Sequence, residues 1–172
     1  LNNFMLIEGQ IKYLATVPDD QKVTIKPFNP KGLEVADLIM KDIKSVEPDL
    51  EVVLMGSLPL RILGQEDIDI SVFCIKSEQL KQIDNFKKLF GEPKRRGKNS
   101  IGWEFEKDGF IVSIWLTDSN AETTKAQVKV FNLLKNNLDL LKEYKKIKEE
   151  SKSLTYKEYQ IRKYKFFNKI LE

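Results

Sequence analysis

The sequence predicts an α/β (α+β) protein, in which a mixed β-sheet is flanked by helices and followed by a helical C-terminal extension. Three observations predict this class. Short apolar or alternating runs, typical of strands, recur at 51–55, 67–75, 102–106 and 110–116. Longer runs with helical spacing lie before and between them. From Ser119 onward only helical spacing remains, so the strands belong to the first two thirds of the chain.

Three elements are expected before the first of these strands. Residues 3–16 predict a short helix, and residues 22–28 alternate in the manner of an edge strand. Asn29 and Pro30 then predict a helix start, with Asn29 as the cap and Pro30 in the first turn. Pro48 stops that helix.

The later elements are marked by their start and stop signals. Ser77 is expected to cap the helix after the second strand, and Gly91 to end it. The tight-turn sequence Lys-Asp-Gly at 107–109 predicts a hairpin between the last two strands. Thr155 and Glu158 form a capping-box pair at the start of the last helix.

No linker, repeat or low-complexity stretch divides the chain. Its 172 residues are long enough for one good core and short for two domains. We therefore expect a single domain over 1–172, with an α/β core over 1–118 and C-terminal helices over 119–172 packed on it. The chain begins with Leu1 rather than Met, as expected of a trimmed or differently initiated product.

The composition excludes several kinds of chemistry. The chain has no histidine, which removes Ser-His and Cys-His catalysis and histidine-ligated zinc. The single cysteine, Cys74, rules out an intramolecular disulfide and fits a reducing cytoplasm; its apolar surroundings favour a buried side chain over a nucleophile. No apolar run approaches the roughly 18–20 residues that span a bilayer, and no secretory signal opens the chain. The net charge of +3 is mild, so local clusters matter more than the total.

The most informative stretch places Gly56 and Ser57 after one apolar strand, and Asp67 and Asp69 at the start of the next. Glycine leaves the backbone bare for a ligand, and a serine hydroxyl with nearby amides suits a phosphate. Because residues two apart on a strand share a face, the two aspartates are expected to point together. Adjacent carboxylates repel unless a cation lies between them, and Mg²⁺ bridged by nucleotide phosphates is the usual one. The pattern therefore predicts a phosphoryl- or nucleotidyl-transfer site.

This pattern resembles the nucleotidyltransferase superfamily, in which an apolar strand, Gly-Ser or Gly-Gly, a spacer and Asp-x-Asp follow one another. The order of features from Val23 to Leu171 also resembles the GrpB family, a branch of that superfamily. The segments that carry this likeness are KPFNP at 26–30, FNLLKNN at 131–137 and LKEYKK at 141–146, together with the tyrosines and lysines of the last helix. The resemblance implies a nucleotidyltransferase-like fold, Mg²⁺ as cofactor and a nucleoside triphosphate as substrate or ligand.

The chain departs from these families at two points. GrpB proteins usually keep only the second aspartate, after a longer spacer, whereas this chain has both Asp67 and Asp69. Active nucleotidyltransferases carry a third carboxylate in the middle of a later strand, where this chain has Ser113. That acid is a metal ligand and the expected base for an attacking hydroxyl. Its loss leaves nucleotide binding intact and puts turnover in doubt.

Other residues near this site have a functional and an ordinary interpretation. Glu104, Glu106 and Asp118 are candidates to replace the missing acid, although Glu104 and Glu106 are more simply explained as ordinary exposed strand acids. Arg61 is either a phosphate clamp or a surface arginine. The basic cluster at 94–98 suits a triphosphate or a nucleic-acid backbone, or is a solvated loop.

Two further groups favour packing or solvation over binding. Trp103 and Trp115 lie on neighbouring strands of the hairpin, where they either pack in the core or line a base pocket. The many lysines of the C-terminal helices alternate with glutamates, which favours a solvent-exposed face over an RNA-binding stripe.

Three functions follow from these residues. In the first, Asp67 and Asp69 hold Mg²⁺ for transfer of a nucleotidyl group from a nucleoside triphosphate to an unknown hydroxyl acceptor, with Arg61 stabilising the developing charge. The alternative is a catalytically inactive module of the same fold that binds a nucleotide or a partner. A third is a recognition or structural protein without a nucleotide. The expected ligand is a nucleotide or nucleotide-containing small molecule, nucleic acid stays open as a partner, and no membrane is expected. The acceptor and the oligomeric state do not follow from the sequence.

Overall fold

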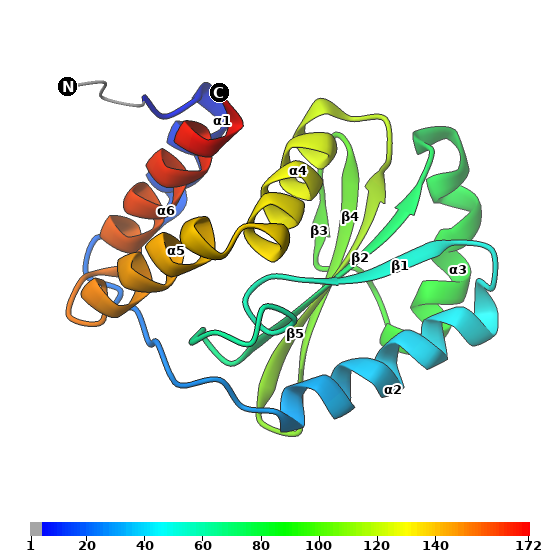
Figure 1. The fold of residues 1–172 in the computed structure, drawn as a ribbon. Coiled ribbons are helices and arrows are strands. Elements are labelled where there is room, and N and C mark those ends of the chain that lie inside the picture. Colours follow the sequence, from blue (N-terminus) through cyan, green and yellow to red (C-terminus); the bar gives the residue numbers. More distant parts are fainter. Residues whose placement is uncertain (1–4) are drawn as a thin grey trace. The chain divides into compact units, whose positions relative to one another are not determined.

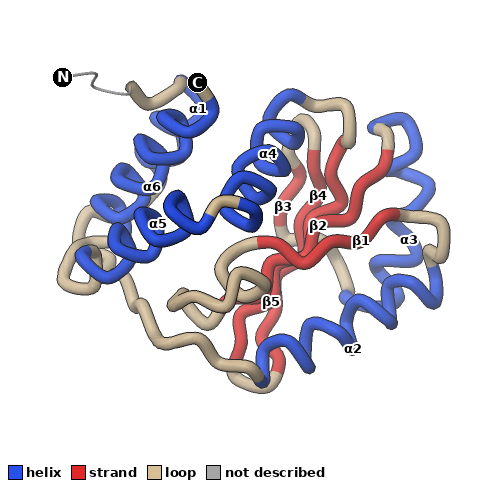
Figure 2. Tube along the Cα trace, viewed as in Figure 1, coloured by secondary structure: helices blue, strands red, loops and turns tan. Residues whose placement is uncertain are grey.

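The computed structural model describes residues 5–172, whose contacts group into two compact units. The sheet unit comprises Phe28–Arg61 and Glu66–Gln127, and the helical unit comprises the described residues up to Pro27, Ile62–Gln65 and Val128–Glu172. Figures 1 and 2 show the elements along the chain. Their order is α1 (Glu8–Thr16), α2 (Lys31–Val46), β1 (Glu51–Met55), β2 (Asp67–Cys74), η1 (Lys76–Glu78), α3 (Gln79–Phe90), β3 (Arg95–Arg96), β4 (Ser100–Lys107), β5 (Phe110–Asp118), α4 (Glu122–Asn136), α5 (Leu138–Glu150) and α6 (Tyr156–Leu171).

The sheet unit contains one mixed sheet with the strand order β1-β2-β5-β4-β3. β2 and β5 run parallel, and the other neighbours run antiparallel. The predicted α+β class with a mixed sheet is therefore confirmed. β4 and β5 form the predicted hairpin, whose two turn residues, Asp108 and Gly109, have φ angles of 52° and 84°. Such positive values at both central positions are typical of the type I′ turn that suits the twist of paired strands.

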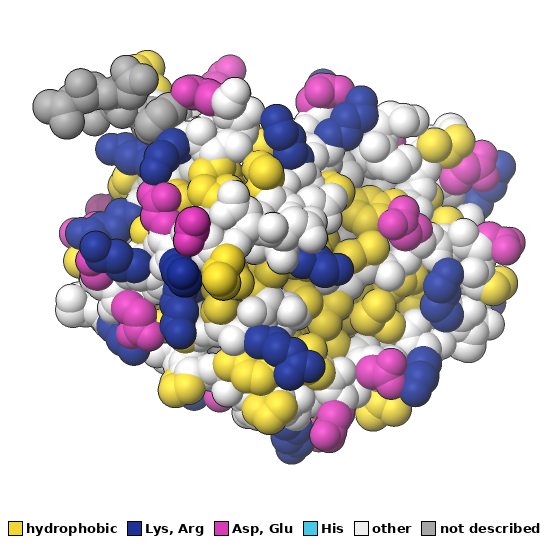
Figure 3. Space-filling model, viewed as in Figure 1, with side chains coloured by type: hydrophobic (Ala, Val, Ile, Leu, Met, Phe, Trp, Pro, Cys, Tyr) yellow, Lys and Arg dark blue, Asp and Glu magenta, His cyan; other side chains and the backbone are white. Residues whose placement is uncertain are grey.

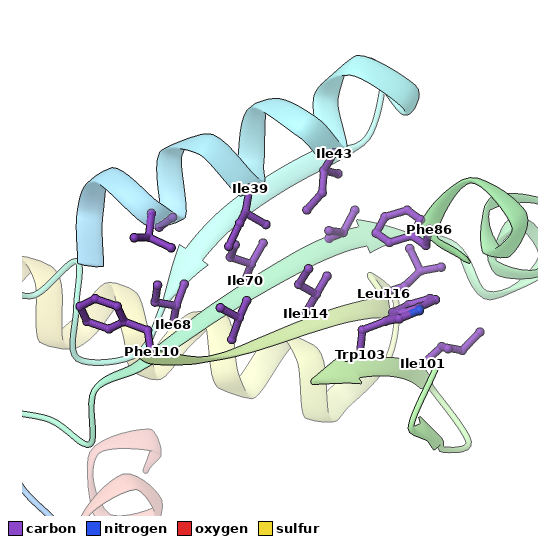
Figure 4. Packing of buried hydrophobic residues seen from close by; sticks show 14 of the residues in the cluster. Ile39, Ile43, Ile68, Ile70, Phe86, Ile101, Trp103, Phe110, Ile114 and Leu116 are labelled. Atoms are coloured by element: carbon purple, nitrogen blue, oxygen red, sulfur yellow. The ribbon is translucent and has the colours of Figure 1, made fainter. Parts of the chain in front are cut away.

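α2 and α3 cover one face of this sheet and form the core with it (Figure 4). Every second residue of β2 faces the helices, and Ile68, Ile70 and Val72 have no exposed surface. β5 does the same with Val112, Ile114 and Leu116. Burial of each such side chain contributes about 1.5–3 kcal/mol relative to leaving it in water. This one-sided burial fixes which side chains of β2 and β5 lie on the opposite face.

The helical unit is built from α1, the end of α4, α5 and α6. The predicted capping box is present at α6, where the Thr155 hydroxyl accepts from the Glu158 amide and the Glu158 carboxylate accepts from Thr155. Tyr144 of α5 and Phe166 of α6 stack with ring centroids 5.8 Å apart. Figure 3 shows basic and acidic side chains side by side over α5 and α6. Lys169 of α6 and Glu143 of α5 form one ion pair between these helices. Such alternation is typical of a solvated surface.

Several predicted elements differ in the structure. Residues 22–28 form no strand; only two isolated bridges occur there, Lys22 with Thr155 and Lys26 with Gly64. Pro27 has no amide hydrogen, which prevents a continuous ladder. The first helix begins at Glu8 rather than at residue 3, and residues 3 and 4 lie outside the described part.

Two smaller differences concern the chain around α3. Ser77 does not cap this helix; it lies inside η1, and α3 begins only at Gln79. Arg95 and Arg96, expected in a loop, pair with β4 as the short edge strand β3. None of the helices formed by residues 5–172 combines the length and apolar character that crossing a bilayer requires.

Candidate functional site

The first part of the site is a close approach between Gly56 and Asp69. β1 and β2 are antiparallel with Met55 opposite Asp69, so the residue that follows β1 lies against this aspartate. Gly56 has a φ angle of 77°, and a Cβ atom built on it would lie 2.6 Å from Asp69 Oδ2. A side chain at this position would therefore be both strained and in collision with the carboxylate. Only glycine brings the bare backbone this close to Asp69.

Asp67 and Asp69 leave the sheet on the face that α2 and α3 do not cover. Ile68 and Ile70, which alternate with them, are fully buried in the core on the other face. Both aspartates are partly exposed. The alternation of β2 therefore places the two carboxylates on one face, as the spacing in the sequence predicts.

Ser113 lies directly beside Asp69. The parallel register of β2 and β5 pairs these two residues, and the antiparallel register of β5 and β4 pairs Ser113 with Glu104. Asp69, Ser113 and Glu104 thus form one row across three strands on the same face. Within residues 5–172 no three acidic or cysteine side chains gather closely enough to hold a metal ion by themselves. The position expected to carry a third acid is occupied by a neutral hydroxyl.

The three acids considered as replacements lie at different places. Glu104 lies two strands from Asp69, about 10 Å away at the usual strand spacing, and its carboxylate pairs with Arg95 at 3.3 Å. Glu106 is exposed and lies in the next row, two strands from Asp67.

Asp118 is the third of these acids, and the structure separates it from the site. It ends β5 opposite Cys74, at the other end of β2 from Asp67, and only 8% of its surface is exposed. Its carboxylate accepts a hydrogen bond from the Asn120 amide, 3.0 Å away. The Asp118 carboxylate therefore stabilises the turn before α4. Of the three candidate acids, Glu104 and Glu106 share a face with Asp67 and Asp69, and Asp118 does not.

Ser57 and Arg61 lie in the segment that connects β1 with β2. This segment begins as a turn, in which the Arg61 amide donates to the Leu58 carbonyl at 3.0 Å, so no helix start follows Ser57. Arg61 has a φ angle of 55°, and its guanidinium lies 5.9 Å from the centre of the Phe28 ring. Ser57 is partly exposed and follows Gly56 directly. A phosphate-binding role for Ser57 and Arg61 stays a prediction.

The two tryptophans lie on opposite faces of the sheet. Trp103 is 1% exposed in the core, where its indole N–H donates to the Gly91 carbonyl at 2.9 Å. Trp115 is partly exposed and follows Ser113 on the face of the aspartates. The core interpretation therefore holds for Trp103 and not for Trp115.

Cys74 faces the core at the end of β2. Burial raises the pKa of its thiol to about 11, with smaller contributions from Asp118, Glu47 and Glu78, whose negative charges also oppose the thiolate. A thiol that stays protonated at neutral pH is a poor nucleophile. The structure therefore favours the packing interpretation of Cys74.

A pair missed in the sequence is Arg95 with Trp115. The Arg95 guanidinium lies 5.8 Å from the centre of the Trp115 ring, and the same guanidinium pairs with Glu104. The sequence did contain the information that pairs β4 with β5, because the two-residue turn of the hairpin fixes the register of these two strands. Counting back from that turn places Glu104 opposite Ser113 and Gly102 opposite Trp115. The pairing of β3 carries no comparable signal.

Comparison with known proteins supports the fold. No family model and no curated protein matches the sequence. Among solved structures, GrpB from Enterococcus faecalis matches with a TM-score of 0.63 and 14% identity, over 86% of this chain and 99% of GrpB. The resemblance to GrpB seen in the sequence is thereby confirmed at the level of the fold.

Two nucleotidyltransferase structures match more weakly. A cytoplasmic RNA terminal U-transferase is 22% identical over 83% of this chain and 47% of its own, with a TM-score of 0.41. The Cid1 poly(U) polymerase with Mg and 3'-dATP bound is 20% identical over 89% of this chain and 52% of its own, with a TM-score of 0.43. The chain spans about half the length of these transferases. Likeness at this level carries no conclusion about activity.

Proposed function

We propose that this chain binds a magnesium–nucleotide complex at the corner formed by Gly56, Ser57, Asp67 and Asp69. The observation that supports it most is the backbone of Gly56 held against the Asp69 carboxylate, with Asp67 on the same face. A bare backbone turn beside two carboxylates is suited to a phosphate group and a hard cation together.

The residues of this corner fit Mg²⁺. This ion is usually bound by one or two carboxylates plus substrate phosphates, rather than by a cage of protein ligands alone. Asp67 and Asp69 supply two carboxylates from one strand face, and a bound cation would neutralise the repulsion between them and the phosphates. Gly56 leaves room for a phosphate, and the Ser57 hydroxyl is placed to donate to a phosphate oxygen. Arg61 is the candidate for a second contact to the phosphate chain.

We favour binding over turnover because of Ser113. The position beside Asp69 holds a hydroxyl, which neither ligates Mg²⁺ strongly nor accepts a proton from an attacking hydroxyl at neutral pH. The protein is then a nucleotide-binding module, with a nucleotide or a nucleotide-containing molecule as its ligand. The cytoplasm, where such ligands occur and where its single thiol stays reduced, is the proposed location.

Nucleotidyl transfer to a hydroxyl acceptor is the second candidate, and the place of Glu104 favours it. Glu104 lies in the row of Asp69 and Ser113 and is the nearest acid of β4 to that row. To act as the base it must leave Arg95 and accept the proton of the acceptor hydroxyl.

Calorimetric titration with ATP, with and without Mg²⁺, tests the proposal. The wild-type chain should bind ATP only with Mg²⁺, and Asp67→Asn should weaken this binding at least about tenfold, because one charged ligand is lost. Ser71→Ala, on the same face of the same strand and without a carboxylate, is the matched control and should bind as the wild type does. Equal ATP affinity of Asp67→Asn and the wild type, or an ATP affinity that is the same with and without Mg²⁺, would contradict the proposal.

Turnover separates the two candidates. A module should release no pyrophosphate from labelled ATP in the presence of a mixture of nucleoside, sugar and RNA hydroxyl acceptors. If pyrophosphate is released, the transfer hypothesis requires that Glu104→Gln reduce the rate at least about a hundredfold while leaving ATP affinity unchanged. Release that Glu104→Gln does not affect would exclude this residue as the base.

A further inference from the structure

Trp115 is held flat on the site face of the sheet by the absence of a side chain opposite it. Gly102 of β4 pairs with Trp115 of β5, and a Cβ atom built on Gly102 would lie 2.6–3.0 Å from three atoms of the indole ring. The ring therefore extends across β4 toward the edge strand β3. A large aromatic side chain that stays partly exposed on a sheet, with its orientation fixed by a glycine, is suited to stacking.

Arg95 covers this ring from the edge strand. Arg95 pairs with Gly102 in the sheet, and its guanidinium lies over the indole at 5.8 Å from the ring centre. Its other contact is the ion pair with Glu104, and the Arg95 side chain remains 57% exposed. Exposed ion pairs of this kind contribute little to stability, so a ligand displaces such a guanidinium, or stacks on it, at little cost.

The edge next to this ring is strongly basic. Lys94, Arg95, Arg96 and Lys98 are all exposed, and they are the densest cluster of positive charge in the sequence. Trp115 also lies close to the aspartates: it is one strand across and two residues along from Asp69, about 5 Å and 7 Å at usual strand dimensions. Of the two residues of β3, Arg95 pairs with Gly102 and lies on the face of Trp115, whereas Arg96 pairs with Ile101 on the core face. Arg95, Trp115 and the two carboxylates thus follow one another across one face.

We infer that β3 and Trp115 bind a single-stranded polynucleotide, with a base stacked on Trp115 and its phosphates along the basic edge. Stacking on an aromatic ring beside a positively charged track is the usual way in which proteins hold single strands without reading their sequence. A duplex hides the faces of its bases, so the arrangement is suited to single strands. This inference rests on the proposed function in one respect only. The bound polynucleotide would run from the basic edge toward the corner of Gly56 and the two aspartates, so both sites would bind nucleotide ligands.

Fluorescence of the full chain provides the test. Trp103 is buried in the core, so quenching by a stacked base reports on Trp115. Oligo(U), oligo(A) and oligo(dT) are titrated without Mg²⁺, together with AMP and a duplex of equal length. We expect quenching by the single strands at lower concentration than by AMP or the duplex. Trp115→Phe should abolish the quenching and retain binding by anisotropy, whereas Trp115→Ala should weaken that binding about tenfold.

The charges are tested by salt dependence. Arg95→Ala should reduce the slope of log K against log salt by about 0.7, the change expected for one lost phosphate contact on a single strand. Arg96→Ala, on the opposite face of the same strand, should change the slope less. Lys41→Ala/Lys81→Ala removes two exposed lysines from α2 and α3, and should leave both affinity and slope unchanged. Circular dichroism and the melting temperature check that each variant is folded.

Three outcomes would overturn the inference: no binding of single strands, an equal loss in the lysine control pair, or quenching by AMP as strong as by the oligomers. The last would indicate a base pocket for a mononucleotide. The result also separates the two proposals. Oligonucleotide binding that depends on Trp115, without any Mg-dependent ATP binding, upholds this inference and refutes the proposed function. The reverse pattern refutes this inference alone.

Discussion

The two faces of β2 and β5 come from the same residues in alternation, and they differ in what determines them. On the core face, Ile68, Ile70 and Ile114 are fully buried under α2 and α3. On the other face, Asp69 and Ser113 are partly exposed and polar. Packing within the chain explains the first face, whereas the second face carries two carboxylates, Asp67 and Asp69, on one strand.

This difference teaches where a functional interpretation is justified. Two like charges placed close together on one strand face repel each other, which departs from what a sheet alone would select and suits a bound cation. The glycine that admits the Asp69 carboxylate adds a second such departure, because its backbone is in the left-handed region. Departures from good packing that coincide in space favour a ligand site over chance.

The largest change in stability should come from a substitution on the core face of the sheet. Ile70→Ala should lower the free energy of unfolding by about 2–5 kcal/mol, because it leaves a cavity between β2 and α2. Ser71→Ala, one residue along on the other face, should change it by less than about 0.5 kcal/mol. Urea unfolding of both variants measures the contrast, and similar losses would mean that the two faces do not differ in packing.

Gly56→Ala should have the second largest effect, and should lower both the stability of the protein and its affinity for ATP. The left-handed backbone costs about 1–2 kcal/mol, and the new methyl group must displace the Asp69 carboxylate. Gly109→Ala is the matched control, since its φ angle is 84° and no atom lies within 4 Å of the added Cβ. Both variants should lose stability, but only Gly56→Ala should lose ATP affinity. An equal affinity in the two variants would separate Gly56 from the site.

Ser113→Asp adds a carboxylate beside Asp69, at the position where active nucleotidyltransferases carry their third acid, and so increases the difference between the two faces. A third carboxylate beside Asp69 should lower the unfolding free energy by about 1 kcal/mol without metal, through charge repulsion. Mg²⁺ should restore it and raise the melting temperature, because the ion binds the folded state. Ser113→Asn has the same size without the charge and should not respond to Mg²⁺. A Ser113→Asp chain that Mg²⁺ does not stabilise would argue against a cation site here.

The smallest effect on stability is expected for Glu104→Gln. In the ion pair of Glu104 with Arg95, the two side chains are 36% and 57% exposed. Loss of the pair should therefore change the free energy of unfolding by less than about 0.5 kcal/mol. Chemical denaturation checks this value. A loss above about 1 kcal/mol would show that the pair stabilises the fold and would contradict its easy displacement by a ligand.

The sequence predicted local structure better than pairing between distant segments. The alternation of β2, the turn at Asp108 and Gly109 and the cap at Thr155 depend on neighbouring residues, and the structure confirms them. The supposed strand at 22–28 failed because alternation alone does not supply a partner, and Pro27 prevents a ladder.

The candidate site divides in the same way. That the two aspartates share a face follows from their spacing, whereas the contact of Asp69 with Gly56 depends on how β1 pairs with β2. Ser113 was placed beside the aspartates through a family resemblance, and the parallel register now shows it there. The basic cluster at 94–98 was recognised, but the contact of Arg95 with Trp115 was missed because a two-residue edge strand has too little pattern to be predicted.

The parallel pairing of β2 with β5 has a consequence for how the protein folds. β1 and β2 are close neighbours in the sequence and can meet early, but the strand beside Asp69 arrives only after α3 and β4 have been made. Closing so long a loop costs entropy before any contact repays it, which makes such a step slow. The row from Asp69 to Glu104 is therefore expected to assemble late, and a nascent chain that ends before Phe110 carries the aspartates without it.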